Sequence, residues 1–220
     1  LSGTDITHYI DRFLYALENK VKMEKAIFYL SGSNDFTDYR YVKIDEPELF
    51  RDDLYQKWDM LNIFGRVYVS KEGINSQISV PEKHWNKFIA QLNKIEELKN
   101  IHIKQALQDG PSFYKLTIKV REELVAYGIP EDTYDMNQTG NHLSSKEYNK
   151  ALEDPNTVIV DMRNYYESEI GKFENALIPN VETSKELLPE VKGILRGKEN
   201  DPILLYCTGG IRCEKASAYL

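Results

Sequence analysis

Hydrophobic positions recur along the first half of the chain with two different periods. In the first 25 positions the apolar residues lie three or four apart, which predicts an amphipathic helix over residues 1–25. The residues that set this helical period are Ile6, Ile10, Phe13, Leu14 and Leu17. This segment precedes the first domain, and we expect it to pack on that domain or to contact a partner.

Residues 26–128 then alternate between strand and helix periods. The predicted elements are a strand (26–30), a helix (47–61), a hairpin (66–70 and 74–80), a helix opened by Pro81 that runs to residue 98, and a strand (114–120). In the returning hairpin strand, Ile74, Ser76, Ile78 and Val80 are expected to face inward. This β-α-β-β-α-β order predicts an α+β domain of the ferredoxin-like (acylphosphatase-like) type.

The second half of the chain has a different pattern. Residues 157–161 and 203–206 are continuous apolar runs, which are typical of strands buried in a parallel sheet. Residues 129–140 are polar, acidic and without periodicity, so they are interpreted as a linker. Residues 141–220, with a short helix over 146–152, are therefore predicted to form an α/β domain.

Composition narrows the class of protein. The chain has 220 residues, 41% of them hydrophobic, a mean hydropathy of −0.52, and no apolar stretch long enough to span a membrane. Its only two cysteines are Cys207 and Cys213, which argues against a disulfide-stapled secreted fold and favours a cytoplasmic location. The four histidines lack metal-ligand spacing, so no metal site is predicted.

Charge is spread unevenly over the chain. The net charge is −7, yet residues 81–121 carry 8 Lys and Arg against 4 Asp and Glu, whereas residues 122–220 carry 10 against 18. A local basic face can bind a nucleic-acid phosphate backbone although the whole chain is acidic, because salt screens distant charges. The alternative interpretation of residues 81–121 is a solvated helix face.

The segment from Cys207 to Cys213, CTGGIRC, carries the candidate chemistry. It follows the apolar run 203–206 and precedes a helical segment, so Cys207 ends a strand and its loop opens a helix. The loop amides and the positive helix end favour a thiolate or a bound oxyanion, and Arg212 adds a positive charge. Cys207 and Arg212 are therefore the candidate catalytic residues. The candidate anion-binding loop comprises Thr208, Gly209, Gly210, Ile211 and Cys213.

The length of this loop distinguishes two kinds of chemistry. A Cys-x5-Arg loop would indicate a phosphatase, but Cys207 and Arg212 are separated by only four residues. The tighter loop suits a sulfur atom better than a phosphate. A buried structural thiol remains the alternative for Cys207.

Several segments resemble a known family. The loop, residues 158–163 (VIVDMR) and residues 171–179 resemble a rhodanese domain, whose loop cysteine carries a persulfide. Residues 206–217 (YCTGGIRCEKAS) and 65–81 (GRVYVSKEGINSQISVP) are more specific, and resemble the bacterial-type tRNA wobble-uridine hydroxylases. The likeness covers about residues 26–220. It implies that 141–220 is a rhodanese-like domain that stops within the helix after the loop, so we expect the chain to be a fragment and this domain alone to be poorly stable.

The resemblance also implies a function. Members of this family use molecular oxygen as co-substrate to form 5-hydroxyuridine at the first anticodon position. Here Cys207 would be essential, Arg212 and the loop amides would hold an anion or intermediate, and the basic segment 81–121 would hold tRNA. Asp161 and Arg163 match the family's Asp-x-Arg pair, for which bracing the loop and direct catalysis are the two interpretations. The sequence contains no detectable cofactor motif.

Two alternative functions and the role of Cys213 remain open at the level of the sequence. The chain could be a thiosulfate-type sulfurtransferase with a Cys207 persulfide, since a thiolate in an anion cradle suits attack on thiosulfate. It could also be a non-catalytic rhodanese binding module. Cys213 is either a resolving thiol or a small structural residue whose thiolate the helix dipole would favour; a tight loop is expected to point the two sulfurs in different directions.

Overall fold

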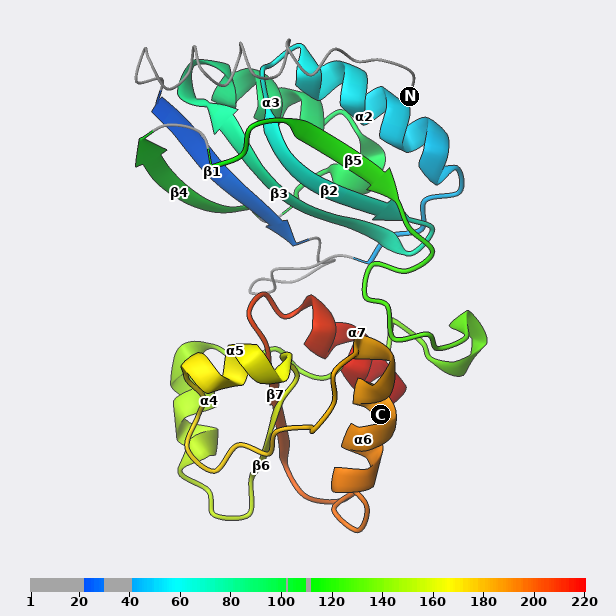
Figure 1. Ribbon diagram of the computed structural model, residues 1–220, viewed down its shortest axis with the longest axis vertical. Helices are drawn as coiled ribbons and strands as arrows, with labels where there is room; N and C mark the ends of the chain where they lie inside the picture. The colour runs from blue at the N-terminus through cyan, green and yellow to red at the C-terminus, as the bar shows by residue number, and fades with distance from the viewer. Residues whose placement is uncertain (1–21, 30–40, 102, 110–111) are drawn as a thin grey trace. The chain divides into compact units, whose positions relative to one another are not determined.

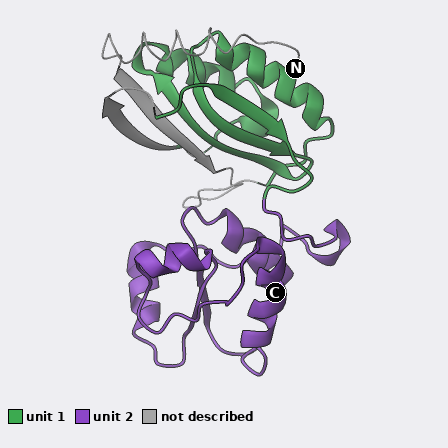
Figure 2. Ribbon diagram, in the orientation of Figure 1, with its two compact units in different colours: residues 1–33, 38–124 green, residues 34–37, 125–220 purple. Residues whose placement is uncertain are grey.

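The computed structural model describes residues 22–29, 41–101, 103–109 and 112–220, with residues 22–29 and 104–109 described by their backbone. Among the described residues, one compact unit runs to Leu124 and a second runs from Val125 to Leu220 (Figure 2). Most of the predicted helix over 1–25 lies outside the described residues. Its last four positions belong to a strand, β1 (Lys22–Tyr29), so the helix prediction is wrong there.

The first unit is built on a five-stranded sheet in the order β4-β1-β3-β2-β5 (Figure 1). β2 (Phe64–Ser70) and β3 (Gly73–Pro81) form the predicted hairpin around Lys71 and Glu72, with Ser70 opposite Gly73. β4 (Ile103–Asp109) and β1 are antiparallel, whereas β5 (Leu116–Val120) runs parallel to β2. Gly65 in β2 has φ +152°, and a Cβ there would overlap the Gln77 carbonyl oxygen, so this close approach of the two strands requires glycine.

Two helices cover one face of this sheet. α2 (Pro47–Asp59) and α3 (Trp85–Leu92) pack through Leu54, Trp58, Phe88 and Leu92 onto the apolar side chains of β2, β3 and β5. The predicted inward positions Ile74, Ser76, Ile78 and Val80 are all buried, as a two-residue period requires. Short 3-10 turns, Glu82–His84 and Glu96–Leu98, flank α3, so the predicted helix over 81–98 is broken into three pieces.

The ferredoxin-like order is present, but its last strand is not the one predicted from the sequence. β4 occupies the edge beside β1, the position of the final strand in a β-α-β-β-α-β fold. β5, which the alternating pattern over 114–120 predicted as that final strand, is an additional strand at the opposite edge, beside β2. The sequence IKQALQD of β4 has no strict apolar–polar alternation, so its strand was not predicted.

The second unit is an α/β arrangement around two parallel strands, β6 (Val158–Asp161) and β7 (Ile203–Tyr206). Its helices are α4 (Ser145–Leu152), α5 (Tyr165–Ile170), α6 (Ser184–Ile194) and α7 (Ile211–Tyr219). β6 is buried along its whole length and also bridges Leu177, as predicted for an inner strand. In β7 only Leu204 is buried, so the expectation of a fully buried strand is wrong for β7. The physical reason is that β7 pairs only with β6 among the described strands.

Residues 125–140 belong to the second unit, which moves the domain boundary from 128 to 124. Val125 and Tyr127 are buried, the Tyr127 hydroxyl donates to the Arg212 carbonyl oxygen at 2.9 Å, and the Gly140 amide donates to Ser217 Oγ at 2.9 Å. The predicted linker therefore packs on α7, with a 3-10 turn at Glu131–Thr133. Among the described helices, none combines the length and apolar character needed to cross a membrane.

Candidate active site at the Cys207 loop

The Cys207 loop connects the carboxyl end of β7 to the first turn of α7, as the sequence predicted. Gly210 caps α7 with φ +88°, a left-handed conformation that glycine adopts without strain. This turn points the Gly210 amide at the Cys207 sulfur, at 2.8 Å, and the amides of Gly209 and Cys213 also donate to that sulfur. Ile211 is buried and anchors the start of the helix. The loop amides therefore surround the sulfur itself.

This environment lowers the pKa of the Cys207 thiol to about 5. The largest cause is a hydrogen bond from the Cys213 side chain, which outweighs the effect of burial in the opposite direction. Backbone amides and the positive charge of Arg212 lower the pKa further. Cys207 is a thiolate at neutral pH, the form that acts as a nucleophile.

The structure differs from two expectations for Cys213: that its sulfur points away from Cys207, and that the helix dipole favours its thiolate. The two sulfurs are hydrogen-bonded to each other, so they do not point in different directions. This contact with the Cys207 sulfur, together with burial, raises the pKa of Cys213 well above its ordinary value, so the helix dipole does not make it a thiolate. Cys213 is a protonated thiol that donates to Cys207, and both cysteines are free.

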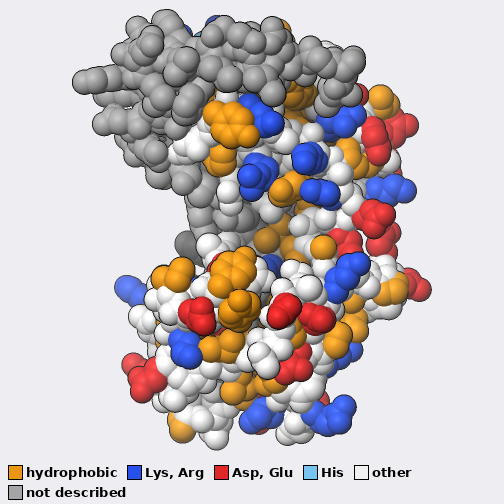
Figure 3. Space-filling model, viewed as in Figure 1, with side chains coloured by type: hydrophobic (Ala, Val, Ile, Leu, Met, Phe, Trp, Pro, Cys, Tyr) orange, Lys and Arg blue, Asp and Glu red, His pale blue; other side chains and the backbone are white. Residues whose placement is uncertain are grey.

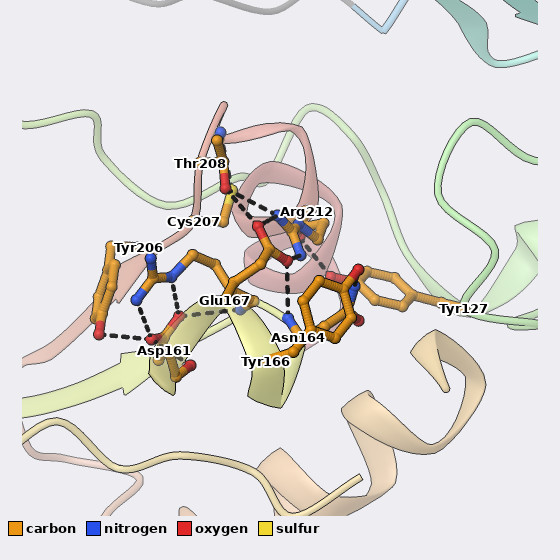
Figure 4. Close-up of polar contacts among 12 residues, drawn as sticks. Tyr127, Asp161, Asn164, Tyr166, Glu167, Tyr206, Cys207, Thr208 and Arg212 are labelled. Carbon is orange, nitrogen blue, oxygen red and sulfur yellow. Dashed lines mark hydrogen bonds and ion pairs between the residues drawn. The ribbon is translucent and has the colours of Figure 1, made fainter. Parts of the chain in front are cut away.

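Arg212 points into a polar cluster rather than into an empty cradle (Figure 4). Its guanidinium forms a bidentate ion pair with Glu167 of α5, at 2.7 Å to Oε2 and 3.0 Å to Oε1, and donates to Thr208 Oγ1 at 3.2 Å. The Thr208 hydroxyl donates to Glu167 Oε1 at 2.7 Å. The hydrogen bonds from Arg212 are the main reason that the pKa of Glu167 falls to about 2. Sequence reasoning did not identify Glu167; its one local signal is its place three residues after Asn164, as the third residue of a helix cap.

Asp161 and Arg163 both contact Tyr206, the residue that precedes Cys207. The fully buried Asp161 carboxylate accepts from Arg163 Nε at 2.8 Å and Nη2 at 2.7 Å, from Ser168 Oγ at 2.8 Å and from the Tyr206 hydroxyl at 2.7 Å. Arg163 also donates to the Gly171 carbonyl oxygen at 2.6 Å. These contacts link the end of β6, α5 and the end of β7, which is the arrangement that a bracing role requires.

Two further residues at this site were not identified from the sequence. Tyr127, in the segment assigned to the first domain, is buried against the loop, and its hydroxyl bonds the Arg212 carbonyl oxygen. Lys215 of α7 is fully buried, donates to the Val125 carbonyl oxygen at 3.3 Å and lies 5.3 Å from the centre of the Tyr134 ring. Both fasten residues 125–134 to the helix that follows the loop.

Two domain families match the chain in the same order as its two units. Residues 36–124 match the UPF0176 acylphosphatase-like domain, and residues 144–220 match the rhodanese-like domain. The fold and the site therefore define a rhodanese-like protein with an acylphosphatase-like domain on the N-terminal side of the rhodanese-like domain. The predicted fold classes of both domains are confirmed.

The relatives narrow this class further. The chain is 46% identical to a tRNA uridine(34) hydroxylase of Leptospira interrogans over 83% of its length, and 45% identical to one of Hamiltonella defensa over 93%. A protein of the same name from Escherichia fergusonii is 46% identical over 83% of the chain. The matches cover 50%, 58% and 53% of these proteins, so the chain spans about half the length of the curated relatives it matches. The chain belongs to the family of these relatives.

Proposed function

We propose that this chain is part of an enzyme that hydroxylates the wobble uridine of tRNA at C5, with molecular oxygen as co-substrate and Cys207 as the essential residue. The observation that carries the proposal is an activated thiolate in an intact rhodanese loop, within a chain whose relatives at 45 to 46% identity are named tRNA uridine(34) hydroxylase. One oxygen atom of O2 enters the C5–H bond and the other leaves as water; a two-electron reductant from outside the chain supplies the two electrons, and solvent supplies the two protons. The expected cytoplasmic location is part of the same proposal.

The open face of the first unit's sheet supports tRNA as the partner. Side chains of β2 and β5 that alternate with the core point away from α2 and α3, and include Arg66, Tyr68 and Lys119, with Tyr68 and Lys119 opposite each other. Arg121 lies 5.3 Å from the centre of the Tyr68 ring. β2, β3 and β5 contain no Asp or Glu, and Lys and Arg side chains gather on the visible face of this unit (Figure 3). Basic and aromatic side chains on one face suit a nucleic-acid backbone and its bases.

This surface refines the predicted basic segment over 81–121. Lys83 and Lys87 lie on the helical side of the sheet, whereas Lys119 lies on its open face, so the segment does not form one surface. We propose that the open face, defined by Arg66, Tyr68, Lys119 and Arg121, contacts tRNA.

Replacing both Arg66 and Lys119 with alanine is expected to weaken tRNA binding about tenfold at physiological salt, because two phosphate contacts are lost. The slope of log K against log salt concentration should fall by about 1 for each lost contact. The matched control is the double replacement of Lys83 and Lys87 with alanine, which removes the same charge from exposed positions on the helical side. Equal losses in both double variants would contradict the proposal for the open face.

The hydroxylation proposal is tested in cells that lack the full-length protein. Re-expressing wild type is expected to restore 5-hydroxyuridine-derived nucleosides in bulk tRNA, measured by mass spectrometry, whereas Cys207→Ser should restore less than about 1% of that level, since serine is not ionised at neutral pH. Restoration by Cys207→Ser would contradict the role of the thiolate. A thiosulfate–cyanide assay on both proteins examines the sulfurtransferase alternative, which the same activated thiolate favours: turnover that depends on Cys207, with an unchanged tRNA profile, would support it instead.

A further inference from the structure

The only positively charged side chain contributed by residues 207–213 is Arg212, and it forms an ion pair with Glu167. Both carboxylate oxygens of Glu167 accept from the guanidinium, and one of them also accepts from Thr208. Glu167 comes from α5, 45 residues away in sequence, and its carboxylate points at Arg212 and Thr208 beside the loop (Figure 4). Arg212, which the sequence predicts to bind an incoming anion, is thus already paired with Glu167.

The charges at the loop sum to a net negative value. The Cys207 thiolate and the Glu167 carboxylate each contribute −1 at neutral pH, and Arg212 contributes +1. The loop amides of Gly209, Gly210 and Cys213 already donate to the sulfur. A free oxyanion would therefore meet one uncompensated negative charge and amides that the thiolate already uses, whereas an uncharged uracil ring carries no charge to be repelled.

We propose that Glu167 is a specificity-determining residue, which neutralises Arg212 and thereby keeps small oxyanions, including anionic sulfur donors, away from the Cys207 loop. The inference deepens the proposed function and rests on it only in placing the reaction at Cys207. Its consequence is that the loop accepts an uncharged group, and that the phosphates of the substrate are bound elsewhere on the protein.

The contacts of Glu167 indicate a variant that keeps the local fold. Glu167 also accepts from the Asn164 amide at 3.0 Å through Oε2, which caps α5. Glutamine has the same shape and retains one acceptor oxygen, so Glu167→Gln can preserve the cap or one bond to Arg212 while removing the negative charge. Glu169 lies on the same helix and is exposed, so Glu169→Gln is a control with the same change of charge.

The test measures anion binding at the loop without tRNA. Full-length wild type, Glu167→Gln and Glu169→Gln are alkylated with iodoacetamide at pH 7.5 in increasing sodium sulfate, with sodium chloride holding the ionic strength constant. Trypsin cuts after Lys198 and Arg212, so the peptide 199–212 reports Cys207 alone by mass spectrometry. We expect sulfate to protect Cys207 in Glu167→Gln at about a tenfold lower concentration than in the other two proteins, the effect of one charge-assisted contact.

The protection constants of the three proteins distinguish the proposal from its alternatives. Equal protection constants in all three proteins, in folded samples whose melting temperatures are measured in parallel, would overturn the proposal. Equal gains in Glu167→Gln and Glu169→Gln would also overturn it, because the effect would then be one of overall charge. A structural defect alone does not create an anion site, so a gain confined to Glu167→Gln supports the proposal. Failure of the proposed hydroxylation would appear in the tRNA profile and leave this measurement unaffected.

Discussion

Replacing Cys213 with alanine is expected to slow the alkylation of Cys207 at pH 6.5 by on the order of a hundredfold. The hydrogen bond from the Cys213 thiol is the largest cause of the low pKa of Cys207, about 5 in the wild type. Without this donor, burial of the Cys207 side chain raises its pKa towards the ordinary value of a thiol, roughly 8.5. The thiolate, which nearly all wild-type molecules carry at pH 6.5, then becomes a small fraction.

The measurement is the rate of iodoacetamide alkylation of Cys207 between pH 4 and 9. Tryptic cleavage between Arg212 and Cys213 puts the two cysteines on separate peptides, so each is followed independently in the wild type. Cys213→Ser is the matched control: its hydroxyl still donates, and most of the depression of the Cys207 pKa should remain. If Cys207 in Cys213→Ala still ionises near pH 5, the backbone amides and Arg212 would have to be the dominant causes.

This role for Cys213 could not be predicted from the spacing of the two cysteines. The sequence predicts that Cys207 ends a strand and that Arg212 follows in the first turn of a helix, because the apolar run, the two glycines and the helical segment are all local signals. Whether two side chains six residues apart meet across a tight loop depends on the backbone of Gly209 and Gly210. In the structure Gly210 is left-handed, and the two cysteine side chains are hydrogen-bonded to each other.

The ion pair between Glu167 and Arg212 is a second feature that could not be predicted from the sequence. Its place in the cap of α5 is readable from the sequence, but its bond to Arg212 joins elements 45 residues apart and exists only once α5 and α7 are placed. Similarly, Tyr127 was assigned to the first domain because nothing local links it to α7. The hairpin of β2 and β3 was predicted well for the opposite reason: its alternating period and its turn lie within 17 consecutive residues, from 65 to 81.

Asp161→Asn is expected to destabilise the second unit by about 3 kcal/mol, because it leaves the Arg163 guanidinium partly buried without its counter-charge. The midpoint of this unit's thermal transition should fall by roughly 12 to 24 °C. Asp161 is fully buried and accepts hydrogen bonds from Arg163, Ser168 and Tyr206, and an asparagine side chain cannot accept all of them. Hydrogen exchange should accelerate in the peptide 199–212, which contains β7 and the Cys207 loop.

The pH dependence separates this effect from a general defect. Burial raises the pKa of Asp161, but the bonds from Arg163, Tyr206 and Ser168 outweigh it and hold the pKa below the ordinary 3.8. The stability that this charge contributes is therefore complete above about pH 4 and is lost as pH falls through the lowered pKa. Wild type and Asp161→Asn should differ most near neutral pH and converge in acid. Asp201→Asn, an exposed substitution just before β7, is the control and should have the stability of wild type at every pH. If the difference in stability between wild type and Asp161→Asn is the same at every pH, the charge of Asp161 does not brace the loop.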